Sequence, residues 1–146
     1  MPSELIYLSD TLDALACLPE NVNNAHSYYG ESRFVILASG DSPESLGRVV
    51  NALMGAYEMM ESGHEVKIIF DGAGTQAAAT LSGPDHKYHD LFRQVRSRVS
   101  GICSYCANAF GVAPKIEQAN LPFADDFKGH PSFKALLEEQ YQILTF

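Results

Sequence analysis

The first half of the chain contains one short continuous run of hydrophobic residues, within residues 33–38, and a second apolar segment at residues 64–70, which Glu65 and Lys67 interrupt and which we expect to form a second buried strand. Runs of this length without polar alternation are typical of strands that are buried on both faces of a sheet. Between them, apolar residues recur at helical spacing over residues 46–60, after Pro43 at a first helical position and before Gly63, which suits a helix end. Strand, helix and strand at this spacing predict a parallel βαβ unit with a right-handed crossover.

The rest of the pattern continues this alternation of helices and strands. We expect an alanine-rich helix that ends near residue 81, followed by an amphipathic helix over residues 88–99. A short strand at residues 101–103 and a short helix to residue 110 come next. Residues 112–130 are expected to form loops with a short strand near residue 121, and the chain then continues with a helix over residues 131–139 and a strand over residues 141–146. This order predicts an α/β layered sandwich with a mainly parallel sheet.

The first 32 residues stand apart from this pattern. Several leucines there are followed by a polar, asparagine-rich stretch that is typical of turns. We therefore expect an N-terminal extension over residues 1–32 and one α/β domain over residues 33–146. The extension is expected to pack on this domain or, equally, on a neighbouring subunit.

Composition narrows the class of protein. The chain has 146 residues, of which 46% are hydrophobic and 19% charged, as in ordinary globular domains. Its formal net charge of -8 argues against nucleic acid as a partner, because such binding needs a basic face. No apolar run is long enough to span a bilayer, and the N-terminus lacks the basic flank of a secretory signal. Three cysteines without an export signal therefore predict a cytoplasmic protein with free thiols.

The motif Cys103-Ser104-Tyr105-Cys106 lies where a short strand is expected to run into a helix. A thiol at a helix N-terminus faces unpaired backbone N–H groups and the positive end of the helix dipole, both of which favour the reactive thiolate. Cys103 is therefore a candidate sulfur nucleophile with a lowered pKa, although a buried structural cysteine is the alternative. Cys106, one turn later, either resolves an oxidised Cys103 as a disulfide or packs inward.

Other polar residues are expected beside Cys103. Open parallel sheets bind ligands at the carboxyl ends of their strands, and Ser39, Asp41, Asp71, Gly72 and Cys103 all follow or end a predicted strand. These residues predict a shared cleft whose backbone amides could bind an anion or stabilise a thiolate. Gly72 and Gly74 do not complete a phosphate-binding motif and are expected to form a tight strand-to-helix turn. Thiol exchange at Cys103 needs no cofactor, so none is expected.

Metal binding is not predicted from the sequence. A single Cys-x-x-Cys pair is weak evidence for zinc, because a closed structural site needs four ligands. His86 and His89 flank an amphipathic stripe and are expected at the surface. His130, at an expected helix start, is a possible acid or base for the thiol, but the sequence does not place it there.

The order of these features resembles the DsrE/DsrF-like family over roughly residues 33–146. The resemblance rests on the following segments in order: Ser39-Gly40-Asp41, Gly63, Phe70-Asp71-Gly72-Ala73-Gly74, Cys103, Gly111-Val112, Gly129-His130-Pro131-Ser132 and residues 141–146. It implies a flavodoxin-like three-layer sandwich with a mainly parallel five-stranded sheet, and assembly into trimers or hexamers. It also implies a persulfide-carrying cysteine at the end of the third strand, where Cys103 is the matching position. Cys106 lies outside the family pattern.

The sequence thus leads to a functional hypothesis with an alternative. The first hypothesis is a cytoplasmic homo-oligomer that carries sulfur as a persulfide, or performs thiol-redox chemistry, through Cys103, with Cys106 as an auxiliary thiol. Its partner would be a protein thiol donor or acceptor. The alternative is a non-catalytic module that binds a small ligand or a protein, and a third possibility is a structural subunit that supports an active relative.

Overall fold

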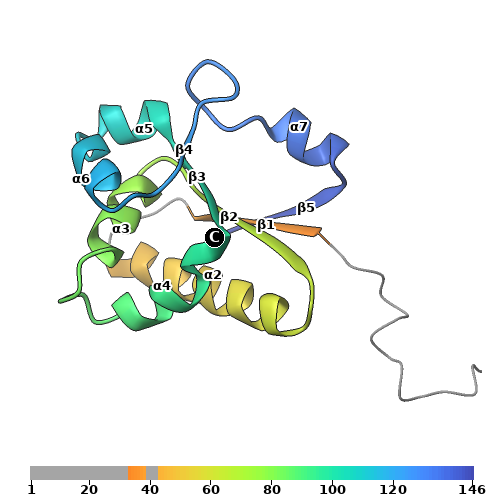
Figure 1. Cartoon of the computed structure of the whole chain (residues 1–146), viewed down its shortest axis with the longest axis horizontal. Coiled ribbons are helices and arrows are strands. Elements are labelled where there is room, and N and C mark those ends of the chain that lie inside the picture. The colour runs from red at the N-terminus through yellow and green to blue at the C-terminus, as the bar shows by residue number, and fades with distance from the viewer. Residues whose placement is uncertain (1–32, 39–42) are drawn as a thin grey trace, which may run out of the picture. The chain divides into compact units, whose positions relative to one another are not determined.

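The computed structural model describes residues 33–38 and 43–146 (Figure 1). The expected extension over residues 1–32 lies outside the described residues. The described elements in chain order are β1 (Arg33–Ala38), α2 (Pro43–Glu61), β2 (Glu65–Phe70), α3 (Gly74–Leu81), α4 (His89–Val95), the 3₁₀ turn η2 (Arg96–Arg98), β3 (Val99–Cys103), α5 (Ser104–Ala109), α6 (Ala113–Gln118), β4 (Phe123–Ala124), α7 (Phe133–Glu138) and β5 (Tyr141–Thr145). None of these helices is both long and apolar enough to cross a membrane.

The strands form one sheet in the order β4-β3-β2-β1-β5, and every neighbouring pair is parallel. The predicted α/β class and parallel βαβ unit are confirmed, because β1 and β2 pair from Arg33 opposite Glu65 to Ala38 opposite Phe70. The expectation of a flavodoxin-like sheet is wrong, since that fold has the strand order 2-1-3-4-5. Here the last strand returns to the free edge of β1, with Tyr141 opposite Arg33, so β1 lies between β2 and β5.

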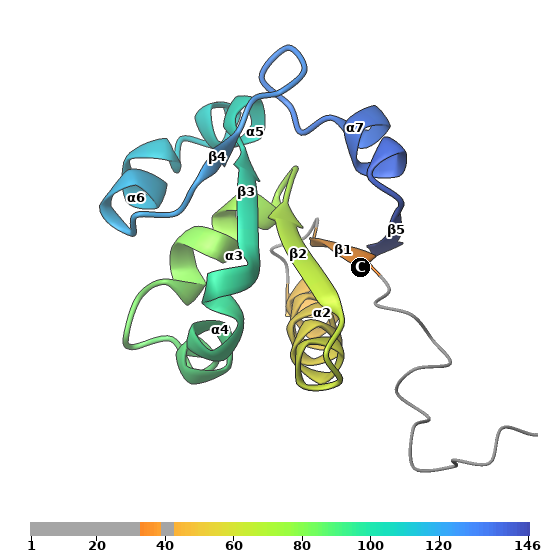
Figure 2. The ribbon, with the colours of Figure 1, turned by 45° about the vertical axis from the view of Figure 1, so that its right-hand side comes forward.

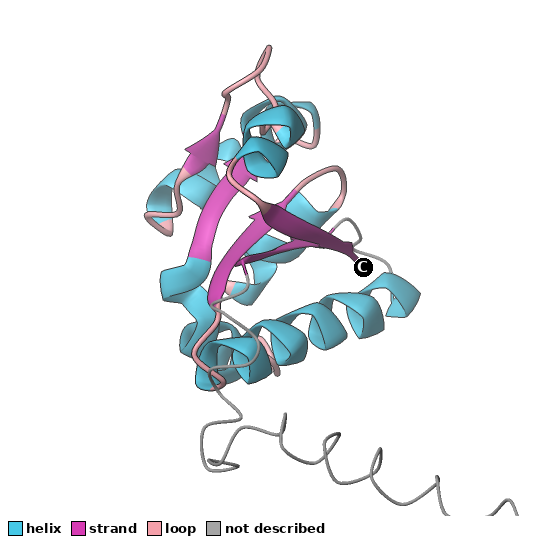
Figure 3. Ribbon diagram, turned by 90° about the vertical axis from the view of Figure 1, so that its right-hand side faces the viewer, coloured by secondary structure: helices cyan, strands magenta, loops and turns pink. Residues whose placement is uncertain are grey.

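Side chains of β2 alternate between two hydrophobic clusters. Val66, Ile68 and Phe70 belong to the larger cluster, which also contains buried residues of α2, α3 and α4. Ile69 belongs to a smaller cluster with Leu136 of α7 and Tyr141 of β5. Because successive strand residues point to opposite faces, the two clusters lie on opposite sides of the sheet. Seen from the side, helices lie on both sides of the strands (Figure 3).

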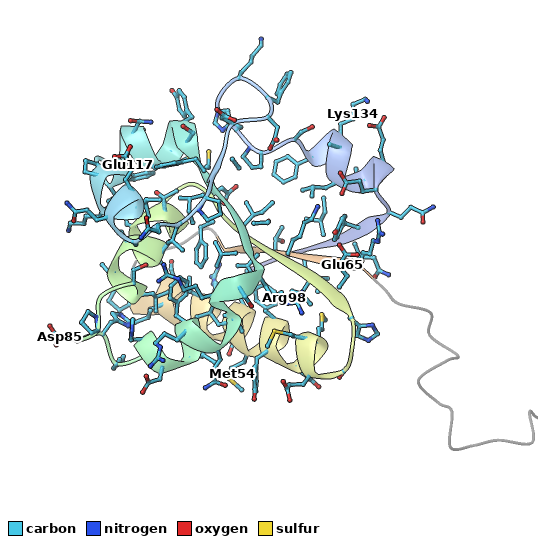
Figure 4. The ribbon with its side chains drawn as sticks, viewed as in Figure 1. Met54, Glu65, Asp85, Arg98, Glu117 and Lys134 are labelled. Atoms are coloured by element: carbon cyan, nitrogen blue, oxygen red, sulfur yellow. The ribbon has the colours of Figure 1, made fainter. Side chains whose placement is uncertain are left out.

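Polar contacts tie the smaller cluster together at the start of β2. The Tyr141 hydroxyl donates a hydrogen bond to Glu65, which is labelled in Figure 4. Lys67 forms an ion pair with Glu139 at 3.0 Å and lies over the Tyr141 ring. These contacts link β2, β5 and the segment after α7 on this face of the sheet.

The region expected to form loops contains a helix and a short strand. Helix α6 (Ala113–Gln118) carries a proline in its first turn, where the missing N–H of proline costs no hydrogen bond. The predicted strand near residue 121 is observed as β4 (Phe123–Ala124), two residues later. Figure 2 shows α5 and α6 together beside the β3–β4 edge of the sheet, and the chain that follows β4 leads to the residues around Cys103.

Gly101 allows β3 to pass close to β4. A Cβ atom at residue 101 would lie only 2.6 Å from the Cβ of Ala124. We expect Gly101→Ala to lower the free energy of unfolding by about 1–3 kcal/mol, because neither backbone can move away without disturbing the ladder. Urea unfolding measures this, with Gly47→Ala as the matched control, since no atom lies within 4 Å of a Cβ there. Equal urea midpoints for Gly101→Ala and wild type would contradict this expectation and show that β3 and β4 can move apart to fit the added methyl group at no cost in stability.

Candidate functional site

Cys103 is the last residue of β3 and the N-cap of helix α5. The backbone N–H of Cys106 points at its sulfur, at 3.5 Å. This contact confirms the prediction that the first thiol of the Cys-x-x-Cys motif caps a helix. The arrangement follows from the local sequence, because a short apolar strand ends directly at the motif and small residues continue it as a helix.

A two-residue hairpin turn brings His130 to this thiol. Phe127 and His130 exchange backbone hydrogen bonds of 2.8 and 3.0 Å across the turn. The two central residues, Lys128 and Gly129, have φ angles of 52° and 85°, the positive values that a type I′ turn requires. The turn places Nδ1 of His130 3.3 Å from Sγ of Cys103.

The hairpin is fastened to the start of α5. The backbone N–H of Tyr105 donates to the Gly129 carbonyl at 2.8 Å, and the rings of Tyr105 and His130 lie 4.8 Å apart between centroids. The Cys103 thiol also lies 3.7 Å from the Gly129 carbonyl oxygen, which can accept its proton in a weak hydrogen bond. Two segments that are far apart in the sequence therefore form one site.

Burial sets the charge state of the Cys103 thiol. The residue has no exposed surface, and this burial is the main cause that raises its pKa to about 11. The N–H of Cys106 acts in the opposite direction, while the neighbouring Asp71 carboxylate adds to the rise. The expectation of a lowered thiol pKa at Cys103 is therefore wrong for this structure, because loss of water around the sulfur outweighs the helix N-terminus.

Cys106 completes a cluster of three side chains. It is partly exposed, and both cysteines are free thiols. The two sulfur atoms and a ring nitrogen of His130 all lie within 4.8 Å of one another. Such a group can transfer a proton from thiol to imidazole, form a disulfide after a small movement, or hold a metal ion.

The other residues of the predicted cleft are only partly described. Asp71 and Gly72 follow β2 in a turn that leads into α3, where the Asp71 carbonyl accepts from the N–H of Gly74 at 2.8 Å. Asp71 lies close enough to Cys103 to affect its pKa, as expected for neighbouring strand ends. Ser39 and Asp41, which follow β1, lie outside the described residues.

The described part of the chain contains a pocket that is separate from the two thiols. It is on the face of the sheet covered by α7, and Lys67, Ser100 and Leu136 are among its lining residues. The two thiols do not line it. The sequence named His130 as a possible acid or base for the thiol but did not place it there, and the structure brings its Nδ1 to 3.3 Å from Sγ of Cys103.

The fold and the site together define an α/β protein with a thiol–imidazole cluster at the carboxyl ends of parallel strands. No protein-family model matches the chain. The chain belongs to the same family as the uncharacterised protein MJ0733 of Methanocaldococcus jannaschii, with 32% identity over 96 residues that cover 66% of this chain and 78% of that protein.

A solved structure supports the fold independently. The conserved protein of unknown function BT1422 from Bacteroides thetaiotaomicron matches with a TM-score of 0.57, over 79% of this chain and 95% of that chain. The identity of 19% makes this a likeness of fold. Neither similar protein carries an assigned activity in its name, so the proposals below rest on the site.

Proposed function

We propose that this protein handles sulfur or thiol electrons at Cys103, as a persulfide carrier or a thiol-redox protein, with Cys106 as the second thiol. The observation that carries the proposal is the 3.3 Å distance between Sγ of Cys103 and Nδ1 of His130. A buried thiol with a raised pKa needs a base beside it before it can act as a nucleophile, and the imidazole of His130 lies within reach of its proton. The resemblance to DsrE/DsrF-like proteins supports the same reading.

The loading step follows from this pair. His130 accepts the Cys103 proton, and the Cys103 thiolate attacks the outer sulfur of a donor persulfide, R–S–SH. The S–S bond of the donor breaks, its thiolate R–S⁻ leaves, and Cys103 becomes a persulfide. The proton held by His130 then passes to the leaving thiolate, so that no external oxidant or reductant is consumed.

Cys106 provides a route for release. Its thiolate can attack the inner sulfur of the Cys103 persulfide, which forms a Cys103–Cys106 disulfide and expels HS⁻. A partner dithiol then reduces this disulfide and is itself oxidised. Transfer to a partner thiolate, which attacks the outer sulfur, leaves Cys103 as a thiolate and needs no disulfide.

The proposal includes the setting in which such chemistry takes place. A reducing cytoplasm keeps the thiols free, and a protein thiol serves as donor or acceptor. Assembly into a homo-oligomer, a trimer or hexamer by the resemblance, belongs to the same proposal. Nucleic acid and membrane play no part in it.

A second candidate function is favoured by the complete burial of Cys103. A thiol without exposed surface also suits a non-catalytic module that binds a small ligand or another protein, with the cysteine as a packing residue. This candidate predicts no uptake of sulfur by the folded protein.

The two candidates separate in a sulfur-loading experiment on the full, reduced, metal-free chain. After incubation with a low-molecular-weight persulfide, we expect intact-protein mass spectrometry to show a gain of one sulfur atom, which peptide mapping assigns to Cys103. His130→Asn is expected to slow loading by about 100-fold or more, the contribution of a positioned general base. The matched control His86→Asn changes a histidine whose Nδ1 accepts the Tyr88 N–H outside the site.

Two results would contradict the proposal. No sulfur gain in folded wild-type protein would favour the binding module. Loading of His130→Asn at the wild-type rate would remove His130 from the mechanism, because a thiol that loads equally well without it uses another base.

A further inference from the structure

We infer that Cys103, Cys106 and His130 form a binding site for a thiophilic divalent metal ion, with Zn²⁺ as the ion that the ligand set suits best. The inference goes beyond the proposed sulfur chemistry and does not depend on it. The sequence offered only the Cys-x-x-Cys pair, which is too few ligands for a zinc site. The structure adds His130 as a third ligand, from a segment 24 residues further along the chain.

The distances between the ligand atoms suit one ion. Zn²⁺ binds thiolate sulfur at about 2.3 Å and imidazole nitrogen at about 2.0–2.1 Å, so tetrahedral ligand atoms lie roughly 3.5 Å apart. Sγ of Cys103 and Nδ1 of His130 are 3.3 Å apart, and all three ligand atoms lie within 4.8 Å of one another. Small side-chain rotations would therefore bring the ligands around an ion.

Neighbouring groups hold these ligands in place. The N–H of Cys106 points at the Cys103 sulfur, the type of contact that stabilises a metal-bound thiolate. The Tyr105 ring lies against the His130 imidazole. The Tyr105 N–H donates a hydrogen bond to the carbonyl of Gly129, the residue before His130. His130 is therefore held facing the thiols.

The ligand types select the class of metal. Two thiolates and one imidazole favour Zn²⁺, whereas Mg²⁺ and Ca²⁺ prefer oxygen ligands. Three protein ligands leave a fourth position for water or a small ligand, as in zinc sites that are open to substrates. On binding, two thiol protons are released to the solvent and no electron is transferred.

Cobalt(II) provides a spectroscopic probe of this site. Titrating Co²⁺ into the reduced full chain is expected to produce thiolate-to-cobalt charge-transfer absorption and intense tetrahedral d–d bands that saturate at one ion per chain. Added Zn²⁺ should displace the cobalt and abolish both signals. Zn²⁺ should also raise the melting temperature, because an ion that binds only the folded state stabilises it.

Variants test each ligand. We expect each of three single variants to weaken Co²⁺ binding more than about 100-fold: Cys103→Ser, Cys106→Ser and His130→Ala. Changing a residue that only supports a metal ligand can already reduce affinity by about 100-fold, so losing a ligand itself should cost at least as much. Cys17→Ser removes the remaining cysteine and should leave the affinity unchanged. His130→Asn serves as a second variant if circular dichroism shows that His130→Ala does not fold.

The outcomes separate this inference from the proposed function. Absence of the charge-transfer band in wild type, or full affinity in a folded His130 variant, would overturn the metal site. Neither result bears on sulfur loading, which is measured in the presence of a chelator. Conversely, a protein that binds Co²⁺ through all three residues but gains no sulfur would retain the metal site and lose the persulfide proposal.

Discussion

Replacing Cys103 with serine is expected to abolish sulfur loading while the fold is retained. The Cys103 sulfur lies 3.3 Å from the imidazole of His130, and a serine hydroxyl there cannot form a persulfide. The smaller hydroxyl can still donate to the Gly129 carbonyl, so we expect the free energy of unfolding to change by only about 1 kcal/mol. Intact-protein mass spectrometry measures the loss of loading, and urea unfolding measures the stability.

Matched cysteine variants give this prediction its controls. Cys17→Ser should load as well as wild type, and Cys106→Ser should load but should release no HS⁻ through an internal disulfide. Sulfur gain that persists in folded Cys103→Ser would assign the acceptor to another thiol and contradict the central role of Cys103.

Replacing Phe92 with alanine is expected to lower the free energy of unfolding by about 3–5 kcal/mol, the range for large aromatic residues in a core. Phe92 of α4 is fully buried and makes an edge-to-face contact with Phe70 of β2, at 6.2 Å between ring centroids. Its removal would leave a cavity between the helical layer and the sheet. Urea unfolding followed by circular dichroism measures the loss.

Phe133→Ala is the matched control for this core prediction. Its side chain lies at the surface at the start of α7, so the same truncation should change stability by no more than about 0.5 kcal/mol. Equal losses for the two variants would mean that Phe92 contributes no more than a surface phenylalanine.

The parts of the fold that follow from local pattern could be predicted from the sequence. The apolar run of β1, the apolar residues of β2 and the periodic positions of α2 needed no tertiary information. The order of the strands depends on which strand β5 pairs with. The alternating apolar and polar residues of β5 do not indicate which edge of the sheet it joins. The flavodoxin-like order was therefore expected from resemblance and is corrected by the pairing of β5 with β1.

The site was predictable only in part for a similar reason. The position of Cys103 at the end of a strand follows from the sequence next to it. The location of His130 depends on β4 pairing with β3 and on a turn with two positive φ angles, and neither is visible near the motif. Burial of Cys103 is also a tertiary property, which explains why the expected direction of its pKa shift was wrong.

The brevity of β4 has a consequence for how the buried sulfur meets a reactant. This strand pairs with β3 through only two residue positions, Phe123 and Ala124, before the chain enters the hairpin that carries His130. Segments held by few backbone hydrogen bonds open at a much smaller free-energy cost than the core of the same domain. The contact of the Tyr105 N–H with the Gly129 carbonyl resists such opening of the hairpin. For the sulfur chemistry that we propose, the rate at which this contact breaks would set an upper limit on the rate of loading at Cys103.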